Sequence, residues 1–118
     1  MSEAQRPPSE ATDLASRMEL GVDALDRGDA EGAALAFAAA VAGATPSDDR
    51  VLAERAAYGA AEALLRLERD DEAAEYLEIA ANSADQELRF LALRRRAMEE
   101  VRRGELPVAL ATYRQAEG

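Results

Sequence analysis

The chain has 118 residues, with 24 acidic side chains against 14 arginines, and its formal net charge is −10. It contains 29 alanines and no His, Cys, Trp or Lys. These absences exclude Cys–His and Ser–His catalysis, Schiff-base lysine chemistry, disulfides, and zinc sites built on Cys or His. The length fits one domain that buries a core of its own.

The first nine residues are polar, carry Pro7 and Pro8, and have no apolar periodicity. They are predicted to form a disordered N-terminal segment (1–9) and are not expected to act as a secretory signal. No apolar run approaches the ~20 residues that cross a bilayer, so membrane insertion is not expected. A cytoplasmic location is expected instead. Abundant alanine, with arginine in place of every lysine, suggests a GC-rich bacterial genome as the source.

The rest of the chain, 10–118, is predicted to be one helical domain. Ala, Leu, Glu, Arg and Met dominate it, and β-branched residues are too scattered to form strands. Turn and capping signals divide this part into six predicted helices, at 10–27, 30–43, 46–68, 71–82, 85–103 and 107–116.

The first two boundaries carry specific signals. Gly28 is placed to end the first helix, and Asp29 is placed to cap the second. Thr45, Pro46 and Asp48 predict a capping box with proline in the first helical position, which starts the third helix at residue 46.

The later boundaries follow the same logic. The acids at 70–72 suit a helix N-terminus, where negative charge is favoured. Ser83 and Gln86 predict another capping box. Two arginines followed by Gly104 predict a helix end, and Pro107 opens the last helix.

The second helix of each predicted pair carries a recurring pattern of small and large residues. The pattern starts at positions 40 and 36 residues apart and reads Ala33-x3-Phe37-x2-Ala40, Ala73-x3-Leu77-x2-Ala80 and Ala109-x3-Tyr113-x2-Ala116. Small residues let antiparallel helices approach closely, and the large residue one turn later fills the space beyond the contact. One pair cannot bury its apolar face alone, so neighbouring pairs must stack.

With this pattern, residues 14–118 resemble the tetratricopeptide repeat family. The first unit has the Leu20-Gly21 pair, the Gly28-Asp29 turn and a terminal Pro46. The later units have Ala61 or Ala97 where that family has glycine. The resemblance implies an all-α, right-handed superhelix of three antiparallel helix pairs. The alternative is an irregular alanine-rich helical bundle.

The chain also departs from the family pattern. Its spacings exceed the family period of about 34 residues, which indicates a longer third helix and preceding loop. Arg17, Ala57 and Leu93 stand where the family has tryptophan. Arg96 and Glu100 fall at positions that should be apolar.

The resemblance implies a non-catalytic interaction module that binds a partner peptide or helix on a concave groove. The groove would be lined by the first helix of each pair, from residues Ala15, Met18, Val22, Leu25, Arg55, Tyr58, Glu62, Leu65, Leu91, Arg94, Met98, Val101 and Arg102. Val22, Leu25, Leu65 and Val101 could equally be core residues, because an apolar stripe on a helix is usually core. The family's chaperone-tail clamp of Lys and Asn is missing.

Charge is unevenly distributed along the chain. Residues 1–85 hold 7 arginines and 19 acids, whereas residues 86–118 hold 7 arginines and 5 acids. The arginines at 94–96 and 102–103 could dock an acidic partner segment through bidentate pairs. They could instead form a solvated face with the pairs Arg95–Glu99 and Arg96–Glu100. Nucleic acid is not expected as a partner, because the net charge repels phosphate and stacking aromatics are scarce.

Two other functions stay open. The last helix exposes Val108, Leu110 and Tyr113 without a polar capping helix after it, which predicts self-association as a homodimer or structural subunit. A small enzyme, or a regulator of one, would need convergent carboxylates with raised pKa values, and nothing in the sequence predicts them. No cofactor and no metal site is expected, because the acidic clusters lack the spacing of a calcium loop. The three units could also belong to a longer array.

Overall fold

The computed structural model describes residues 13–118, and this part of the chain contains six α-helices and no strand. The predicted all-α class is confirmed. The predicted disordered segment 1–9 lies outside the described residues. The helices are α1 (Leu14–Asp26), α2 (Ala30–Gly43), α3 (Arg50–Arg66), α4 (Asp70–Ala81), α5 (Gln86–Arg102) and α6 (Leu106–Glu117).

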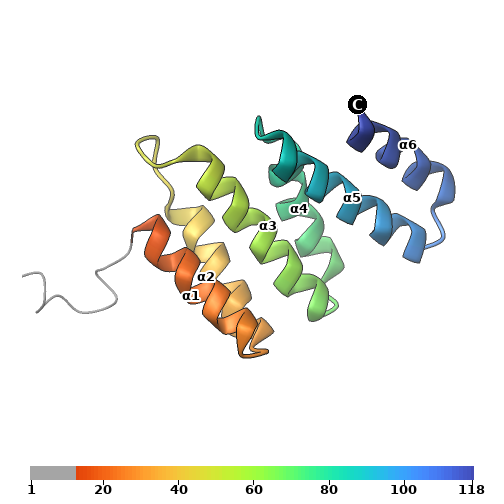
Figure 1. The fold of residues 1–118 in the computed structure, drawn as a ribbon. Coiled ribbons are helices and arrows are strands. Elements are labelled where there is room, and N and C mark those ends of the chain that lie inside the picture. Colours follow the sequence, from red (N-terminus) through yellow and green to blue (C-terminus); the bar gives the residue numbers. More distant parts are fainter. Residues whose placement is uncertain (1–12) are drawn as a thin grey trace, which may run out of the picture.

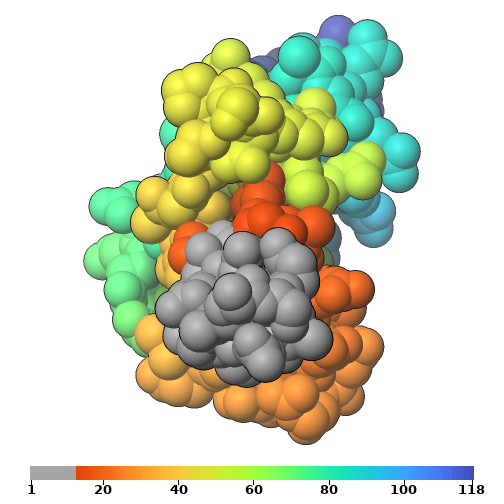
Figure 2. All heavy atoms as spheres, turned by 90° about the vertical axis from the view of Figure 1, so that its left-hand side faces the viewer, coloured from red at the N-terminus to blue at the C-terminus, as the bar shows by residue number. Residues whose placement is uncertain are grey.

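The helices follow one another in a row, and each packs against the next in the chain (Figure 1). α1 also contacts α3, whereas α3 and α5 have no comparable backbone contact. The molecule measures 58 × 28 × 19 Å, with a radius of gyration of 15.5 Å. A compact domain of this length has a radius of about 13 Å, so the arrangement is elongated. Figure 2 looks along it from the α1–α2 end, with the later helices receding behind.

The turn inside each successive helix pair has the same geometry. After α1, Gly28 donates its N–H to the Leu25 carbonyl (2.9 Å) and Asp29 donates to Ala24 (2.8 Å), which is a Schellman motif. The same two bonds recur after α3, from Glu68 to Leu65 and Arg69 to Leu64, and after α5, from Gly104 to Val101 and Glu105 to Glu100. The turn residues 28, 68 and 104 have φ angles of 78°, 59° and 80°. The three turns therefore align the helix pairs at offsets of 40 and 36 residues.

Several predicted helix boundaries are confirmed. Asp29 caps α2 by accepting a hydrogen bond from the Gly32 N–H at 2.8 Å. The first turn of α4 holds three acids, and Pro107 lies in the first turn of α6. These signals act within a single turn of backbone, so the local sequence decides them.

Two predicted helix starts and one predicted cap are wrong. The first helix is predicted from residue 10, but α1 begins at Leu14 because Asp13 caps it by accepting from the Ser16 N–H. Thr45 and Asp48 form an isolated turn in which Asp48 Oδ2 accepts from the Thr45 N–H at 2.7 Å. α3 begins only at Arg50, because Asp49 accepts from the N–H groups of Val51 and Leu52 and so caps the helix.

The wrong cap is that of α5, which begins at Gln86, one residue after its predicted start. Asp85 caps this helix by accepting from the Leu88 N–H at 3.0 Å. Ser83 is buried instead, and its hydroxyl donates to Glu54 Oε1 at 2.7 Å. The Ser83 side chain, which the local pattern predicts to be a helix cap, therefore makes a tertiary hydrogen bond to α3 instead.

The core depends on small residues at equivalent positions. Ala33, Ala73 and Ala109 are all buried. The Phe37 ring lies between α1 and α3, and a Cβ atom added at Gly21 or Gly59 would lie 2.7 or 2.8 Å from it. Those two glycines therefore make room for the ring.

The repeated pattern does not give three identical environments. Leu77, equivalent to Phe37, is also buried, whereas Tyr113 is partly exposed on α6. α4 and α5 pack less extensively than the other consecutive pairs. The longer spacing of the first two units reflects an α2 of 14 residues, against 12 for α4, together with a longer α2–α3 loop.

Candidate functional site

A trough runs between α3 and α5, where these helices lack close backbone contact. Three adjoining cavities of about 330, 190 and 290 Å³ form it. The first two share Tyr58 and Leu91, and the last two share Arg95. The three cavities therefore adjoin one another along the two helices.

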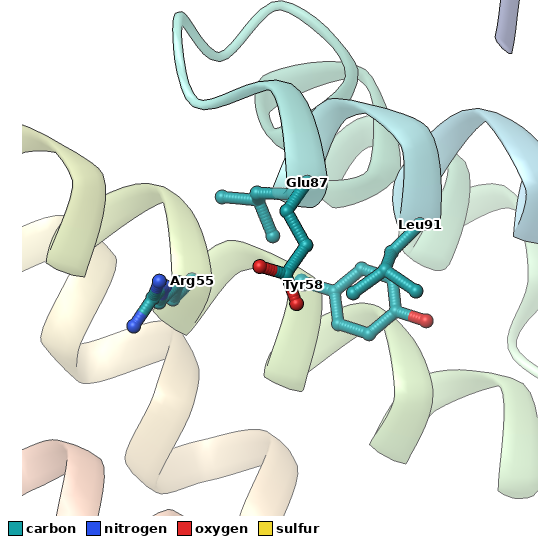
Figure 3. Close-up of a pocket in the computed structure, with 5 residues that line it drawn as sticks. Arg55, Tyr58, Glu87 and Leu91 are labelled. Atoms are coloured by element: carbon teal, nitrogen blue, oxygen red, sulfur yellow. The ribbon is translucent and has the colours of Figure 1, made fainter. Parts of the chain in front are cut away.

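The first cavity is framed by Arg55 and Tyr58 of α3 and by Glu87, Leu88 and Leu91 of α5. Figure 3 shows Glu87 and Leu91 reaching from α5 toward the Tyr58 side of the cavity. Leu88 is buried, so it forms part of the floor. This end offers apolar surface with one cation and one carboxylate at its rim.

The middle cavity combines apolar and cationic side chains. Tyr58, Leu91 and Met98 supply the apolar surface, and Arg94 and Arg95 supply two positive charges, with no acidic residue in the lining. Arg95 lies 3.9 Å from Glu99, whereas Arg94 makes no ion pair within residues 13–118. An apolar group next to a carboxylate would match this chemistry.

Tyr58 holds a proton at neutral pH. Burial raises the pKa of its phenol above the ordinary value of 10.0, and the nearby Glu62 carboxylate raises this pKa further. The hydroxyl can therefore donate a hydrogen bond at the trough, but it is unsuited to act as a general base at neutral pH.

The third cavity is mostly ionic. Arg102 donates to Asp70 Oδ2 at 2.6 Å and to Glu99 Oε1 at 2.8 Å. These bonds raise the pKa of its guanidinium, and the bond to Glu99 has the larger effect. The remaining lining residues are Leu65, Arg66, Glu68 and Arg95. Because Arg102 already has two carboxylate partners, it is less available to a ligand than Arg94.

Contacts at one end of α3 set the position of α5. The buried Glu54 carboxylate accepts from Ser83 in the α4–α5 loop, and the Ser83 hydroxyl accepts from the Asp85 N–H at 3.1 Å. Asp85 also lies 3.7 Å from Arg55. The cap of α5 is thus tied to α3, and this tie holds the first turn of α5 beside Tyr58.

The trough brings together seven of the residues predicted for the groove, from two helices. These residues are Arg55, Tyr58, Leu65, Leu91, Arg94, Met98 and Arg102. They lie on one side of the two helices because their spacing follows the helical period.

The other predicted groove residues lie outside these three cavities. Met18 and Leu25 of α1 pack against the core, whereas Val22 and Val101 are exposed. Leu65, which lines the third cavity, also packs against the core. Of the four residues that could be either core or groove, Leu25 and Leu65 therefore pack against the core, whereas Val22 and Val101 lie on the surface. Glu62 is half-buried and lies beside Tyr58.

The arginine cluster contains one of its two predicted pairs. Arg95 pairs with Glu99, but the predicted pair of Arg96 with Glu100 is wrong. Arg96 instead donates to Glu78 of α4 and Gln115 of α6, both at 3.1 Å. It points between helices, because its position belongs to the packed face of α5.

Sequence reasoning missed Glu87, which lines the first cavity. It stands one turn before Leu91, so extending the stripe of Leu91, Arg94 and Met98 back by one turn would have found it. The buried Glu54 was also missed, because glutamate is almost never buried unless it has a partner, and that partner, Ser83, comes from a distant segment.

The predicted self-association residues lie on α6. Val108, Leu110 and Tyr113 are all exposed there, together with Leu106. They are separate from the trough, since none of them lines its three cavities.

Within residues 13–118, no three His, Cys, Asp or Glu side chains gather in a way that could hold a metal ion. No helix in the same range has the length and apolar character needed to span a bilayer. Comparison of the sequence with known protein families and curated proteins, and of the fold with solved structures, finds no match.

Proposed function

We propose that this chain is a tetratricopeptide-like helical repeat protein, a right-handed superhelix of three helix pairs, that binds a segment of another protein in the α3–α5 trough. The repeat assignment is supported by the three equivalent Schellman turns and by the small buried residues 33, 73 and 109 at matching positions. The elongated stack of pairs fits this architecture, because each unit contacts only its neighbours.

The row of adjoining cavities between α3 and α5 is the observation that carries the binding proposal. Its middle cavity joins the exposed Leu91 and Met98 to the Tyr58 ring. Methionine and tyrosine suit adaptable contact with an apolar side chain. Arg94 and Arg95 stand beside this surface in a chain whose net charge is −10, so the trough attracts acidic segments that the rest of the surface repels.

The partner segment best suited to this trough has an apolar anchor flanked by carboxylates. The anchor would lie on Tyr58, Leu91 and Met98, and a carboxylate would pair with Arg94. Binding without catalysis fits the residues present, because the trough has no His, Cys or Lys that could serve as nucleophile or base.

The test is a selection from a displayed library of random peptides about 12 residues long, a length that spans such a groove. Recovered peptides should be enriched in apolar residues next to Asp or Glu. Their affinity, measured by fluorescence anisotropy, should fall about tenfold or more for Tyr58→Ala and for Arg94→Glu.

Leu35→Ala is the matched control, because Leu35 is an exposed apolar residue on α2, outside the trough. It should bind the same peptides as the unmodified protein does. Circular dichroism must show that all three variants remain helical. Folded Tyr58→Ala and Arg94→Glu variants that bind with unchanged affinity would overturn the proposed site.

A further inference from the structure

α6 carries an apolar stripe that nothing in residues 13–118 covers. Leu106, Leu110 and Tyr113 are spaced at i, i+4 and i+7, which places them on one face of the helix. Their exposed fractions are 60%, 52% and 36%. α6 packs substantially only against α5 and buries Ala109 and Thr112 in that contact.

The position equivalent to Tyr113 is covered in the two preceding helix pairs, whereas Ala74, which corresponds to Leu110, is exposed on α4. Aligned by their turns, Phe37 and Leu77 correspond to Tyr113, and they are only 2% and 3% exposed. The cover over Phe37 comes from α3 of the following pair, where Gly59 lies against the ring. Tyr113 therefore marks the side of α6 on which a further helix would pack, and Leu106 and Leu110 continue its apolar surface along the helix.

We propose that α6 of a second copy covers this stripe, in an antiparallel twofold contact. In such a contact the same residues meet from both copies, so Leu106, Leu110 and Tyr113 of each would be buried together. No charged residue lies on the stripe between positions 106 and 113, so no unpaired charge is buried there.

The other end of the molecule fits the stripe poorly. α3 covers the first pair through the side that carries Gly59, and Ala56 and Ala63, one turn away on either side of it, are buried. Aligned by the turns, α1 has Ser16, Glu19 and Asp23 at those positions. A head-to-tail contact would press two exposed carboxylates against Leu110 and Tyr113, and removing them from water without partners is costly.

The charge distribution also favours contact through α6. Residues 86–118 hold 7 arginines and 5 acids, whereas residues 1–85 hold 19 acids and 7 arginines. α6 lies at one end of a molecule 58 Å long (Figure 1). An end-to-end pair therefore keeps the acidic regions apart by far more than the screening length of about 8 Å at physiological salt.

Sedimentation velocity between about 5 and 500 µM tests the contact, because a small interface gives weak association that depends on protein concentration. The unmodified protein should shift from monomer to dimer over this range. Leu110→Glu should remain monomeric, since the contact would bury two like charges. Leu35→Glu, a matched change of an exposed leucine on α2, should dimerise normally. A monomer at every concentration would overturn the proposal.

Disulfide trapping distinguishes the two geometries, because the chain has no cysteine of its own. Leu110→Cys alone should form a cross-linked dimer on mild oxidation, and Leu20→Cys on α1 should not. Cross-linking only in a mixture of the two variants would indicate head-to-tail contact and contradict the twofold one. Self-association is independent of the trough, so Tyr58→Ala should dimerise normally even if the trough binds no peptide.

Discussion

The packing of Phe37 against Gly21 predicts that Gly21→Ala destabilises the unmodified protein but stabilises a variant that lacks the Phe37 ring. An alanine Cβ at position 21 would lie 2.7 Å from the Phe37 ring, about 1 Å closer than carbon atoms normally pack. Overpacking of this kind costs about 1–3 kcal/mol. Alanine in place of glycine inside a helix returns about 1 kcal/mol, so Gly21→Ala should destabilise the protein by about 1 kcal/mol.

The second helix pair already contains the compensating combination. Its residues equivalent to Gly21 and Phe37 are Ala61 and Leu77, and both are buried. In a Phe37→Leu background the ring is gone, so Gly21→Ala should stabilise the protein by about 0.5–1 kcal/mol through helix propensity. The coupling energy between the two sites is then about 1.5–2 kcal/mol, within the range for residues in contact.

Urea unfolding followed by circular dichroism measures all four proteins of this cycle. The matched control is Gly43→Ala, where the added Cβ would displace only the end of the Arg17 side chain from its hydrogen bond to the Ala39 carbonyl. We expect that control to change stability by no more than about 0.5 kcal/mol in either background. If Gly21→Ala stabilises both the unmodified protein and the Phe37→Leu variant, the tight packing described for the first helix pair is wrong.

Three further predictions concern turns, a buried bond and pH. Glu68→Gly should stabilise the protein by about 1 kcal/mol and Gly28→Ala should destabilise it similarly, because both positions have left-handed φ. Thermal unfolding that shifts the melting temperature of both variants in the same direction would contradict this. Ser83→Ala should cost about 1–3 kcal/mol, because the buried Oε1 of Glu54 loses its hydrogen bond while Oε2 keeps only Arg50 at 3.7 Å. Glu54→Gln should cost less, and the urea midpoints of the two variants measure the difference. The Asp13 pKa lies below 3.8 because its carboxylate accepts hydrogen bonds from Ser16, so its stabilising effect is present above that pH and lost as pH falls through the lowered value. NMR titration of Asp13 checks this, and an unshifted pKa would exclude the cap.

The sequence predicted well wherever one turn of backbone decides the outcome. Gly28 and Asp29 form the turn expected of them, because both act on hydrogen bonds within five residues. Thr45 and Asp48 also make a predicted bond, yet α3 does not start there, because Asp49 offers a competing cap to the next N–H groups.

The site was less predictable because it depends on contacts between distant segments. Glu54 and Ser83 are 29 positions apart, and nothing in either local pattern indicates that they meet. Arg96 bonds to Glu78 of α4 and Gln115 of α6 and not to Glu100, one turn away, because its side of α5 faces those two helices. The periodic stripe on each helix identified half of the residues that line the trough, but the distance between α3 and α5 required the fold.

The three methionines of the chain allow a direct test of the trough as a binding site. Met98 lines its middle cavity, and Met18 packs against the core on α1. With methyl-labelled methionine, adding a selected acidic–apolar peptide should shift the Met98 resonance, identified by its loss in Met98→Leu, and leave the Met18 resonance in place. A bound peptide that leaves Met98 unshifted would contradict binding between α3 and α5.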